Sequence, residues 1–358
     1  MADIEFLKIS SFRNLETIDV KITAPFVCFY GQNAQGKTNI LESLYLSANI
    51  RSFRSGNTNE WIMHGKKQAK VSLGAKDAIS RFTMGYEVNK GFREYFVDDK
   101  QIGSIRGLID RVRIIAYSPS SYELILGDDS ERRLFFDKVV YSMDTKHLED
   151  VVYYNKALKN RNAALKLKKD YSLWDDFIAS SGERIIDKRI KAIGLMKEYF
   201  KDTFSLFFGG NTELDFVYKP SAGISFSEIQ NKLSKESKND ELRGTTGFGP
   251  HRDRIYIILN GREAKSTVST GQAKLIAFLF KIAKLRFIKE FSGKTPVFLY
   301  DDVSAFLDEK RLCQLVEIIK KENVQILSSS VDNNLFKTLF SDSVQFITVR
   351  EGRVDNDG

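Results

Sequence analysis

The 358 residues include 55 Lys and Arg against 47 Asp and Glu, a net charge of +8 that weakly favours a polyanionic partner. With 42% hydrophobic and 28% charged residues, the chain can form a large buried core, which excludes a wholly disordered protein. No apolar run approaches the roughly 20 residues of a membrane-spanning helix, no export signal opens the chain, and Cys28 and Cys313 cannot form a disulfide framework, so we expect a cytoplasmic protein without membrane contact.

The first third of the chain, from Ile4 to about Tyr117, is predicted to consist mostly of short strands. Apolar and polar residues alternate over 4–8 and over 18–22, as they do in half-buried strands. Residues 82–97 indicate a further pair of strands. One amphipathic helix, from Lys37 to about Ala48, interrupts this strand-rich region.

The middle of the chain has helical periodicity, from Ser130 to about Phe208. A polar stretch, 231–243, separates it from the last third, where strands and helices alternate again. The simplest account is an α/β body built from both ends of the chain, 1–117 and 245–358. A mainly helical lobe, 118–244, is then inserted into this body.

Positive charge is concentrated in the predicted helical lobe. Twelve basic and six acidic residues lie between Val151 and Lys201. A pair of solvated helices would account for any one of these lysines. A surface that contacts the phosphate backbone of DNA, with Lys166, Lys168 and Lys169 within it, accounts equally well for the cluster.

A phosphate-binding loop is predicted between the first buried strand and the amphipathic helix. The pattern G-x-x-x-x-G-K-[ST] is met by Gly31, Gln32, Asn33, Ala34, Gln35, Gly36, Lys37 and Thr38. The glycines let backbone N–H groups turn toward phosphate oxygens, and the start of the helix adds its positive dipole end. Lys37 can reach the β- and γ-phosphates of ATP, and the Thr38 hydroxyl can ligate Mg²⁺. The alternative is a glycine-containing loop with an exposed lysine, which the flanking strand and helix disfavour.

A carboxylate for the metal is expected at the end of the apolar strand 297–300. Asp301 follows this strand directly and is the expected second ligand of Mg²⁺. Asp302 would point toward the γ-phosphate and polarise the attacking water. Two solvated aspartates in a turn are the alternative, which is disfavoured in a chain that also contains a phosphate loop.

Two weaker patterns complete the set. Ser269-Thr270-Gly271-Gln272 precedes an apolar helix, and Ser269 suits a helix N-cap. Its place about thirty residues ahead of Asp301 matches the signature motif of ABC-type ATPases, in which this segment completes the site of a second subunit. Residues 304–308 follow the aspartate pair where those ATPases carry their D-loop.

The chain resembles the bacterial RecF family of SMC-like ABC ATPases over nearly its whole length. Besides the motifs above, the resemblance rests on several short blocks in the family's order: Ile9 to Leu15, Thr38 to Tyr45, Ser52-Phe53-Arg54, Tyr117-Ser118-Pro119, Glu131 to Asp137, Lys159 to Asn162, and Gly249-Pro250-His251-Arg252-Asp253. It implies an α/β, ABC-type P-loop ATPase head with an inserted helical lobe.

The resemblance also implies a function. Two heads would dimerise around two ATP molecules, each bound between one phosphate loop and the partner's Ser269, Gly271 and Gln272. The dimer would clamp single- and double-stranded DNA at gaps and open on slow hydrolysis. The implied partners are RecO and RecR and, through them, RecA, in recombination, replication and the SOS response.

Some residues depart from the family pattern. The D-loop has Ala305-Phe306 where the family has Ser-Glu, and Arg254 replaces a second Asp. The strand that follows ends in Ser328-Ser329-Ser330, without a histidine for the γ-phosphate. Two other functions stay open: the ATPase head of a defence nuclease or, as the altered D-loop permits, a degenerate ATPase that serves as a scaffold.

Overall fold

The computed structural model describes residues 3–49, 51–54, 57–77, 79–89, 92–103, 105–208, 212–302, 309–331, 337–338, 340 and 343–355. The chain divides into two compact units. The first unit comprises Met1–Ser121 and Gly293–Gly358, and the second comprises Tyr122–Ser292.

One sheet of the first unit is antiparallel and has the strand order β2-β1-β4-β5-β6-β7. Its strands are β1 (Asp3–Phe12), β2 (Leu15–Lys21), β4 (Gln68–Lys76), β5 (Arg81–Asn89), β6 (Phe92–Val97) and β7 (Lys100–Gln101). Ile4, Leu7 and Ile9 are buried on β1. The predicted strands at 4–8, 18–22 and 82–97 are thereby confirmed.

The second sheet of this unit has the order β15-β14-β3-β13-β12-β8 and is parallel except at the β15 edge. Its strands are β3 (Phe26–Tyr30), β8 (Ile114–Tyr117), β12 (Val297–Tyr300), β13 (Ile326–Ser330), β14 (Val344–Arg350) and β15 (Arg353–Asp355). Because β3 lies between β13 and β14, the two ends of the chain form one sheet, as predicted.

Helix α1 (Lys37–Asn49) contacts both sheets of the first unit. Ile40, Leu41 and Leu44 are completely buried and join side chains from both sheets in one apolar core. The unit also contains η1 (Thr58–Trp61), α2 (Ile105–Ile109), α11 (Glu309–Lys320) and all of η2 (Pro119–Tyr122) except its last residue. This packing fixes the start of α1 beside the ends of the parallel strands.

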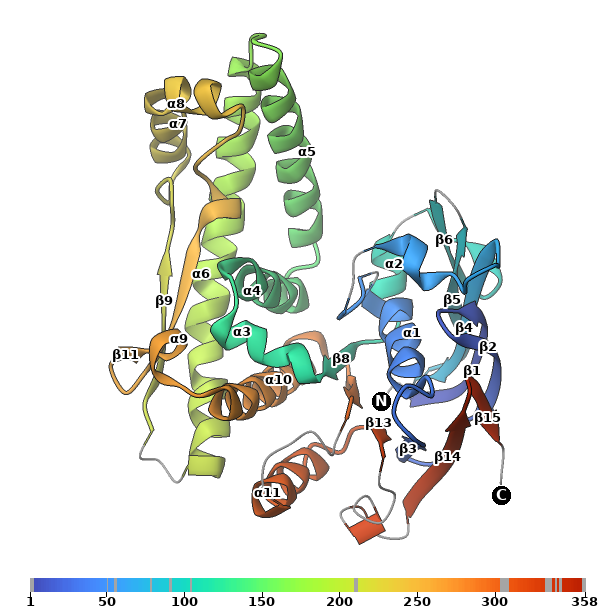
Figure 1. Cartoon of the computed structure of the whole chain (residues 1–358). Helices are drawn as coiled ribbons and strands as arrows, with labels where there is room; N and C mark the ends of the chain where they lie inside the picture. Colours follow the sequence, from blue (N-terminus) through green and yellow to red (C-terminus); the bar gives the residue numbers. More distant parts are fainter. Residues whose placement is uncertain are drawn as a thin grey trace. The chain divides into compact units, whose positions relative to one another are not determined.

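The second unit is mainly helical. Figure 1 shows α5 running beside the long helix α6, with α7 and α8 near one end of this pair. The helices are α3 (Glu123–Leu126), α4 (Asp129–Met143), α5 (His147–Lys166), α6 (Ser172–Phe208), α7 (Phe226–Lys235), α8 (Ser237–Arg243), η3 (Pro250–Arg252), α9 (Ala264–Thr267) and α10 (Thr270–Ser292). A small antiparallel sheet, in the order β11-β10-β9, is formed by β9 (Leu214–Lys219), β10 (Arg254–Leu259) and β11 (Arg262–Glu263). Throughout the described part of the chain, each helix is too short or too polar to cross a membrane.

The end of the inserted region differs from the prediction. It starts within a few residues of 118, but it continues past 244 to Ser292. Strand β10 pairs with β9, and α10 packs on α6 through Phe280, whose ring centroid lies 4.1 Å from that of Phe200. The last third therefore contributes a strand pair and the long helix α10 to the second unit, not to the body.

The polar stretch 231–243 is helical, where a separating segment was expected. A capping box between Ser225 and Glu228 starts α7, and the helix buries only Ile229 and Leu233. Residues 231–243 contain only two apolar side chains, Leu233 and Leu242, so the stretch itself has no apolar stripe in the sequence.

Candidate functional site

The phosphate-loop pattern forms a tight turn between β3 and α1. Gly31 has φ +155°, and a Cβ atom there would lie 2.3 Å from the carbonyl oxygen of Val349. Gly36 has φ +111°, and a Cβ would lie 2.7 Å from the Leu15 side chain. Both positions therefore require glycine. Ala34, at the turn of the loop, is left-handed with φ +65°.

The Lys37 ammonium points back across this loop. Its Nζ donates to the carbonyl oxygens of Gly31 at 2.6 Å and Gln32 at 2.7 Å. Burial lowers its pKa, while the nearby charges of Asp302 and Asp301 act in the opposite direction. The loop thus holds a cation within its curve, where an anionic ligand would meet it.

Thr38, Asp301 and Ser329 meet at one carboxylate oxygen. Asp301 Oδ1 accepts hydrogen bonds from Thr38 Oγ1 at 2.8 Å and from Ser329 Oγ at 2.7 Å. Burial raises the pKa of Asp301, and the two hydroxyl donors oppose this effect. A buried carboxylate beside a threonine hydroxyl is an oxygen donor set that suits Mg²⁺, which takes its remaining ligands from water and phosphate. Within the described ranges, no group of three or more His, Cys, Asp or Glu side chains forms a separate metal cage.

Asp302 is held by its backbone at the edge of this site. It has φ +55°, and its N–H donates to Ser329 Oγ at 2.8 Å. Ser329 thus contacts both aspartates, a role that the sequence did not predict. Its position at the end of β13, the parallel neighbour of β12, could have indicated it, because parallel strands end at one edge of a sheet.

A buried carboxylate of α1 joins three of the motif blocks. Glu42 is completely buried, and Arg13 Nε lies 2.6 Å from its Oε2. Ser52 Oγ donates to Glu42, and the Arg54 guanidinium lies 3.6 Å from it. The sequence placed these residues only within family blocks, because their convergence depends on the tertiary structure.

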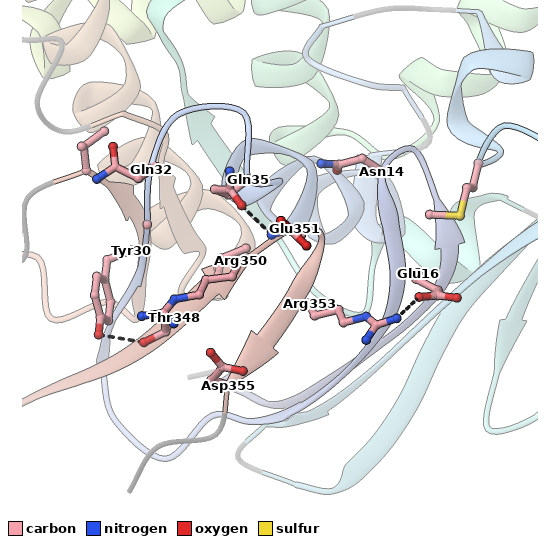
Figure 2. A pocket seen from close by; sticks show the side chains of 14 residues that line it. Asn14, Glu16, Tyr30, Gln32, Gln35, Thr348, Arg350, Glu351, Arg353 and Asp355 are labelled. Atoms are coloured by element: carbon pink, nitrogen blue, oxygen red, sulfur yellow. Dashed lines mark hydrogen bonds and ion pairs between the residues drawn. The ribbon is translucent and has the colours of Figure 1, made fainter.

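A polar cavity of about 920 Å³ adjoins the phosphate loop (Figure 2). Gly31, Gln32 and Gln35 line it together with β14 and β15. Tyr30 accepts a 2.7 Å hydrogen bond from Thr348, and Arg353 forms an ion pair with Glu16 at 2.6 Å. Tyr30, Thr348, Arg353 and Glu16 also line the cavity. The remaining residues that line it are Asn14, Met63, Val331, Val349, Arg350, Glu351 and Asp355.

The Ser269 segment forms the start of α10 in the second unit. Ser269 Oγ accepts from Gln272 N at 3.2 Å, and Gln272 Oε1 accepts from Ser269 N at 2.8 Å. This reciprocal pair is a capping box, so the predicted N-cap is confirmed. Gly271 lies in the first turn. The predicted D-loop, 304–308, lies outside the described residues.

Cys28, Tyr300 and His251, which the sequence also drew attention to, are held by packing or hydrogen bonds within the fold. Cys28 is buried, and burial raises the pKa of its thiol to about 12, as expected of an inert core residue. Tyr300 packs edge-on against Tyr117, with ring centroids 5.6 Å apart. Tyr154 Oη lies 2.6 Å from His251 Nδ1, whose Nε2 lies 3.1 Å from the Thr246 carbonyl oxygen.

The basic residues between Val151 and Lys201 fall into two groups. One group forms ion pairs with carboxylates of the same unit and consists of Arg161, Arg184, Lys188, Arg189 and Lys197. The other group is exposed and unpaired with respect to the described residues. Its members on α5 and the following turn, which we call the lysine face, are Lys156, Lys159, Lys166, Lys168 and Lys169.

Comparison with known proteins assigns the family. The family model described as "RecF/RecN/SMC N terminal domain" matches residues 3–355. A protein named DNA replication and repair protein RecF from Alkaliphilus oremlandii is 30% identical over 98% of this chain and 100% of its own length. The protein of the same name from Geotalea daltonii is 28% identical over 97% of this chain and 98% of its own.

Solved structures agree with this assignment. A structure described as the recombination mediator protein RecF-ATP in the RecFOR pathway matches with a TM-score of 0.87 and 26% identity, over 99% of both chains. An Smc head domain from Pyrococcus furiosus shares the fold, with a TM-score of 0.57 and 15% identity over 99% of this chain and 96% of that one. The SMC-like head fold predicted from the motifs is thus confirmed, and the chain belongs to the RecF family.

Proposed function

We propose that this chain is an ATP-dependent DNA-binding protein of recombinational repair and replication. It dimerises on binding ATP and separates after slow hydrolysis. The observation that carries this proposal is the 2.8 Å contact between Thr38 and Asp301, because it joins the phosphate loop to a strand-end carboxylate at one point. A solved relative described as RecF-ATP, similar over 99% of both chains, supports ATP as the ligand.

The residues of the first unit divide the chemistry between them. The backbone of 31–36 and the Lys37 ammonium bind the phosphates, so Lys37 leaves the carbonyl oxygens of Gly31 and Gln32 for phosphate oxygens. Thr38 and Asp301 would hold Mg²⁺, which when bound neutralises phosphate charge. Asp302 orients and polarises the attacking water. The product is ADP and phosphate.

The Ser269 segment acts in trans in this proposal. Its capping box sets the first turn of α10 and engages the N–H groups of Ser269 and Gln272, so those of Thr270 and Gly271 would meet the phosphate of an ATP bound by the partner subunit. Ser269, Gly271 and Gln272 would complete the partner's site. ATP would therefore hold the dimer together, and its hydrolysis would release it.

DNA is proposed to bind the lysine face. Lys156, Lys159 and Lys166 follow one another at spacings of three and seven, which places them along one side of α5. Their charges are not neutralised by carboxylates of the described chain, so they are available to phosphates. RecR and RecO, and indirectly RecA, are the proposed protein partners at single-strand gaps, since a structural relative is described as part of a RecFOR pathway.

The decisive experiment measures oligomeric state and DNA binding together. We would use light scattering and fluorescence anisotropy with a gapped duplex, without nucleotide, with ADP and with ATP. A dimer and tighter DNA binding are expected with ATP only. One mass and one affinity under all three conditions would contradict the proposed switch.

The same preparation separates the two other functions. A defence nuclease would cut plasmid DNA in the presence of ATP and Mg²⁺, whereas this protein should leave it intact. A degenerate scaffold would release no phosphate from ATP, with or without DNA.

A further inference from the structure

We propose that Asn39 and Asn14 are positioning residues, which transmit the position of Arg54 to the backbone of the phosphate loop and thereby set the affinity for nucleotide. This inference rests on the proposed function, because ATP is the ligand whose affinity is concerned. Neither asparagine is assigned to the metal or to activation of the attacking water.

Three hydrogen bonds form a continuous chain outside the phosphate loop. Arg54 Nη1 donates to Asn39 Oδ1 at 2.7 Å, and Asn39 Nδ2 donates to Asn14 Oδ1 at 2.7 Å. Asn14 Nδ2 then donates to the carbonyl oxygen of Ala34 at 3.3 Å. The chain links residue 54, helix α1 and the β1–β2 turn to the backbone of the loop.

Arg54, as the first donor, fixes the orientation of both asparagine amides in this series of hydrogen bonds. A guanidinium only donates, so the Asn39 oxygen must face Arg54 and its amide nitrogen must face Asn14. The Asn14 oxygen is thereby used as an acceptor, which leaves its NH₂ group for Ala34. The cation at one end polarises both amides in the same sense, which strengthens the last and longest bond.

The series of hydrogen bonds ends at Ala34, a strained point of the phosphate loop. Ala34 is left-handed, a conformation that costs a residue with a Cβ roughly 1–2 kcal/mol. The carbonyl oxygen and the following N–H of a trans peptide point in opposite directions. When Asn14 holds the Ala34 oxygen, it therefore turns the N–H of Gln35 to the other side of the loop, where it is free to meet an anion.

Arg54, the first donor in this series of hydrogen bonds, is anchored independently of the phosphate loop. Arg54 lies 3.6 Å from the buried carboxylate of Glu42, which Arg13 and Ser52 also bind. Because Arg54 is 44% exposed, it remains within reach of solvent and of an approaching ligand or partner. A displacement of Arg54 would release Asn39, and through Asn14 it would release the peptide of Ala34.

The phosphate loop is also held by hydrogen bonds from residues 351 and 352, in addition to the Arg54–Asn39–Asn14 series. The carbonyl oxygen of Gln35 accepts from Gly352 N at 3.0 Å, and its side chain accepts from Glu351 N. Loss of the Asn14 contact should therefore leave the loop folded but less well ordered. We expect weaker ATP binding, with the catalytic step preserved.

A double-mutant cycle tests this inference. ATP dissociation constants would be measured by calorimetry for Asn14→Ala, Arg54→Met and the double variant, in the wild type and in Asn39→Ala. Residues 14 and 54 are joined only through Asn39 in this chain of bonds. Each single change should weaken ATP binding about 3- to 10-fold, the net range for one hydrogen bond. The double variant should bind ATP no more weakly than the single variant with the lower affinity. In the Asn39→Ala background, the two changes should no longer be coupled.

A separate readout distinguishes positioning from general damage. Turnover at saturating ATP should stay within about twofold of wild type while KM rises, because Thr38, Asp301 and Asp302 are unchanged. Asn49→Ala is the matched control: Asn49 lies on the same helix, and its amide donates to the carbonyl oxygens of Tyr45 and Ile114. It should lower thermal stability without changing ATP affinity.

Two outcomes would overturn the inference in distinguishable ways. If the wild type bound no ATP, the proposed function and this inference would both fail. If the wild type bound ATP but the effects of Asn14→Ala and Arg54→Met simply multiplied, only the relay through Asn39 would be wrong.

Discussion

The Thr38 hydroxyl and the Asp301 carboxylate lie 2.8 Å apart although 263 positions separate them in the sequence. Their meeting depends on the sheet order, since β13 alone lies between the strand that carries the phosphate loop and the strand that ends at Asp301. Ser329 at the end of β13 contacts the same carboxylate oxygen at 2.7 Å. Three strand ends thus form one site.

Asp302→Asn should preserve ATP binding and slow hydrolysis about 100-fold or more, because the water loses its polarising carboxylate. The ATP-bound dimer should therefore live longer. Phosphate release and light scattering after ATP addition measure the two effects. A variant that stays monomeric with ATP would count against the switch.

Lys37→Ala should abolish ATP-dependent dimerisation. The change removes the only side-chain cation that contacts the curve of the loop among the described residues, where it bonds to Gly31 and Gln32. ATP affinity should fall by at least tenfold, measured by calorimetry. Lys66→Ala, which removes an exposed lysine of the same unit, serves as the control. Normal ATP-dependent dimers in the Lys37 variant would contradict the assignment.

Charge reversal of Lys156, Lys159 and Lys166 should weaken DNA binding and reduce the slope of log K against log salt by about 3, one for each lost phosphate contact. Salt titrations of fluorescence anisotropy measure this slope. Reversal of Lys21, Lys67 and Lys100, which are exposed in the first unit, makes the same change in net charge as a control. An unchanged slope would place the DNA surface away from the lysine face.

Arg161→Met should destabilise the second unit by about 3–5 kcal/mol. Arg161 is completely buried and lies 2.6 Å from Asp175 and 2.7 Å from the equally buried Asp240, so its removal leaves a charge without compensation. Arg184→Met, which breaks an ion pair of a 47% exposed arginine, should cost less than about 1 kcal/mol. Urea denaturation followed by circular dichroism measures both. Adding Asp240→Asn to Arg161→Met should recover part of the loss.

Stability should fall as the pH is lowered from about 6.5 to about 4. An unfolded histidine has a pKa near 6.5, whereas burial lowers the pKa of His251 to about 4. In this range His251 is protonated in the unfolded chain but stays neutral in the folded chain. The free energy of unfolding therefore falls by roughly 3 kcal/mol by the time the pH reaches about 4. Thermal unfolding across this range measures the loss.

His251→Gln should flatten this pH dependence between 6.5 and 4. The Asp137 carboxylate titrates in a different window: burial would raise its pKa, but Arg189 and His147 hold it below its usual value. Its contribution is therefore lost only below about pH 4. An equally steep decline in the His251 variant would show that another group controls it.

The sequence predicted the parts of the site that are local. The phosphate loop is a continuous pattern whose strand and helix are its own neighbours, and Asp301 follows a recognisable apolar strand. Ser329, Glu42 and the Asn39–Asn14 pair could not be predicted in the same way, since each acts through partners that only the tertiary structure brings close.

The error at 244 has a related cause. Helix α10 buries side chains on nearly all its faces, among them Ala273, Phe278, Phe280 and Leu285. Such a helix has no polar face that shows which unit covers it. Its assignment to the body followed from the adjoining Ser269 motif, whereas aromatic packing against Phe135 and Phe200 attaches it to the second unit.

The position of β3 has a consequence for the synthesis of this protein. Strand β3 is made early, yet both of its hydrogen-bonded neighbours, β13 and β14, come from residues 326–350. On the ribosome, the strand that carries the phosphate loop must therefore wait, unpaired, until nearly the whole chain has emerged. A nascent or prematurely terminated chain would have no completed nucleotide site, so only full-length molecules could enter the ATP cycle.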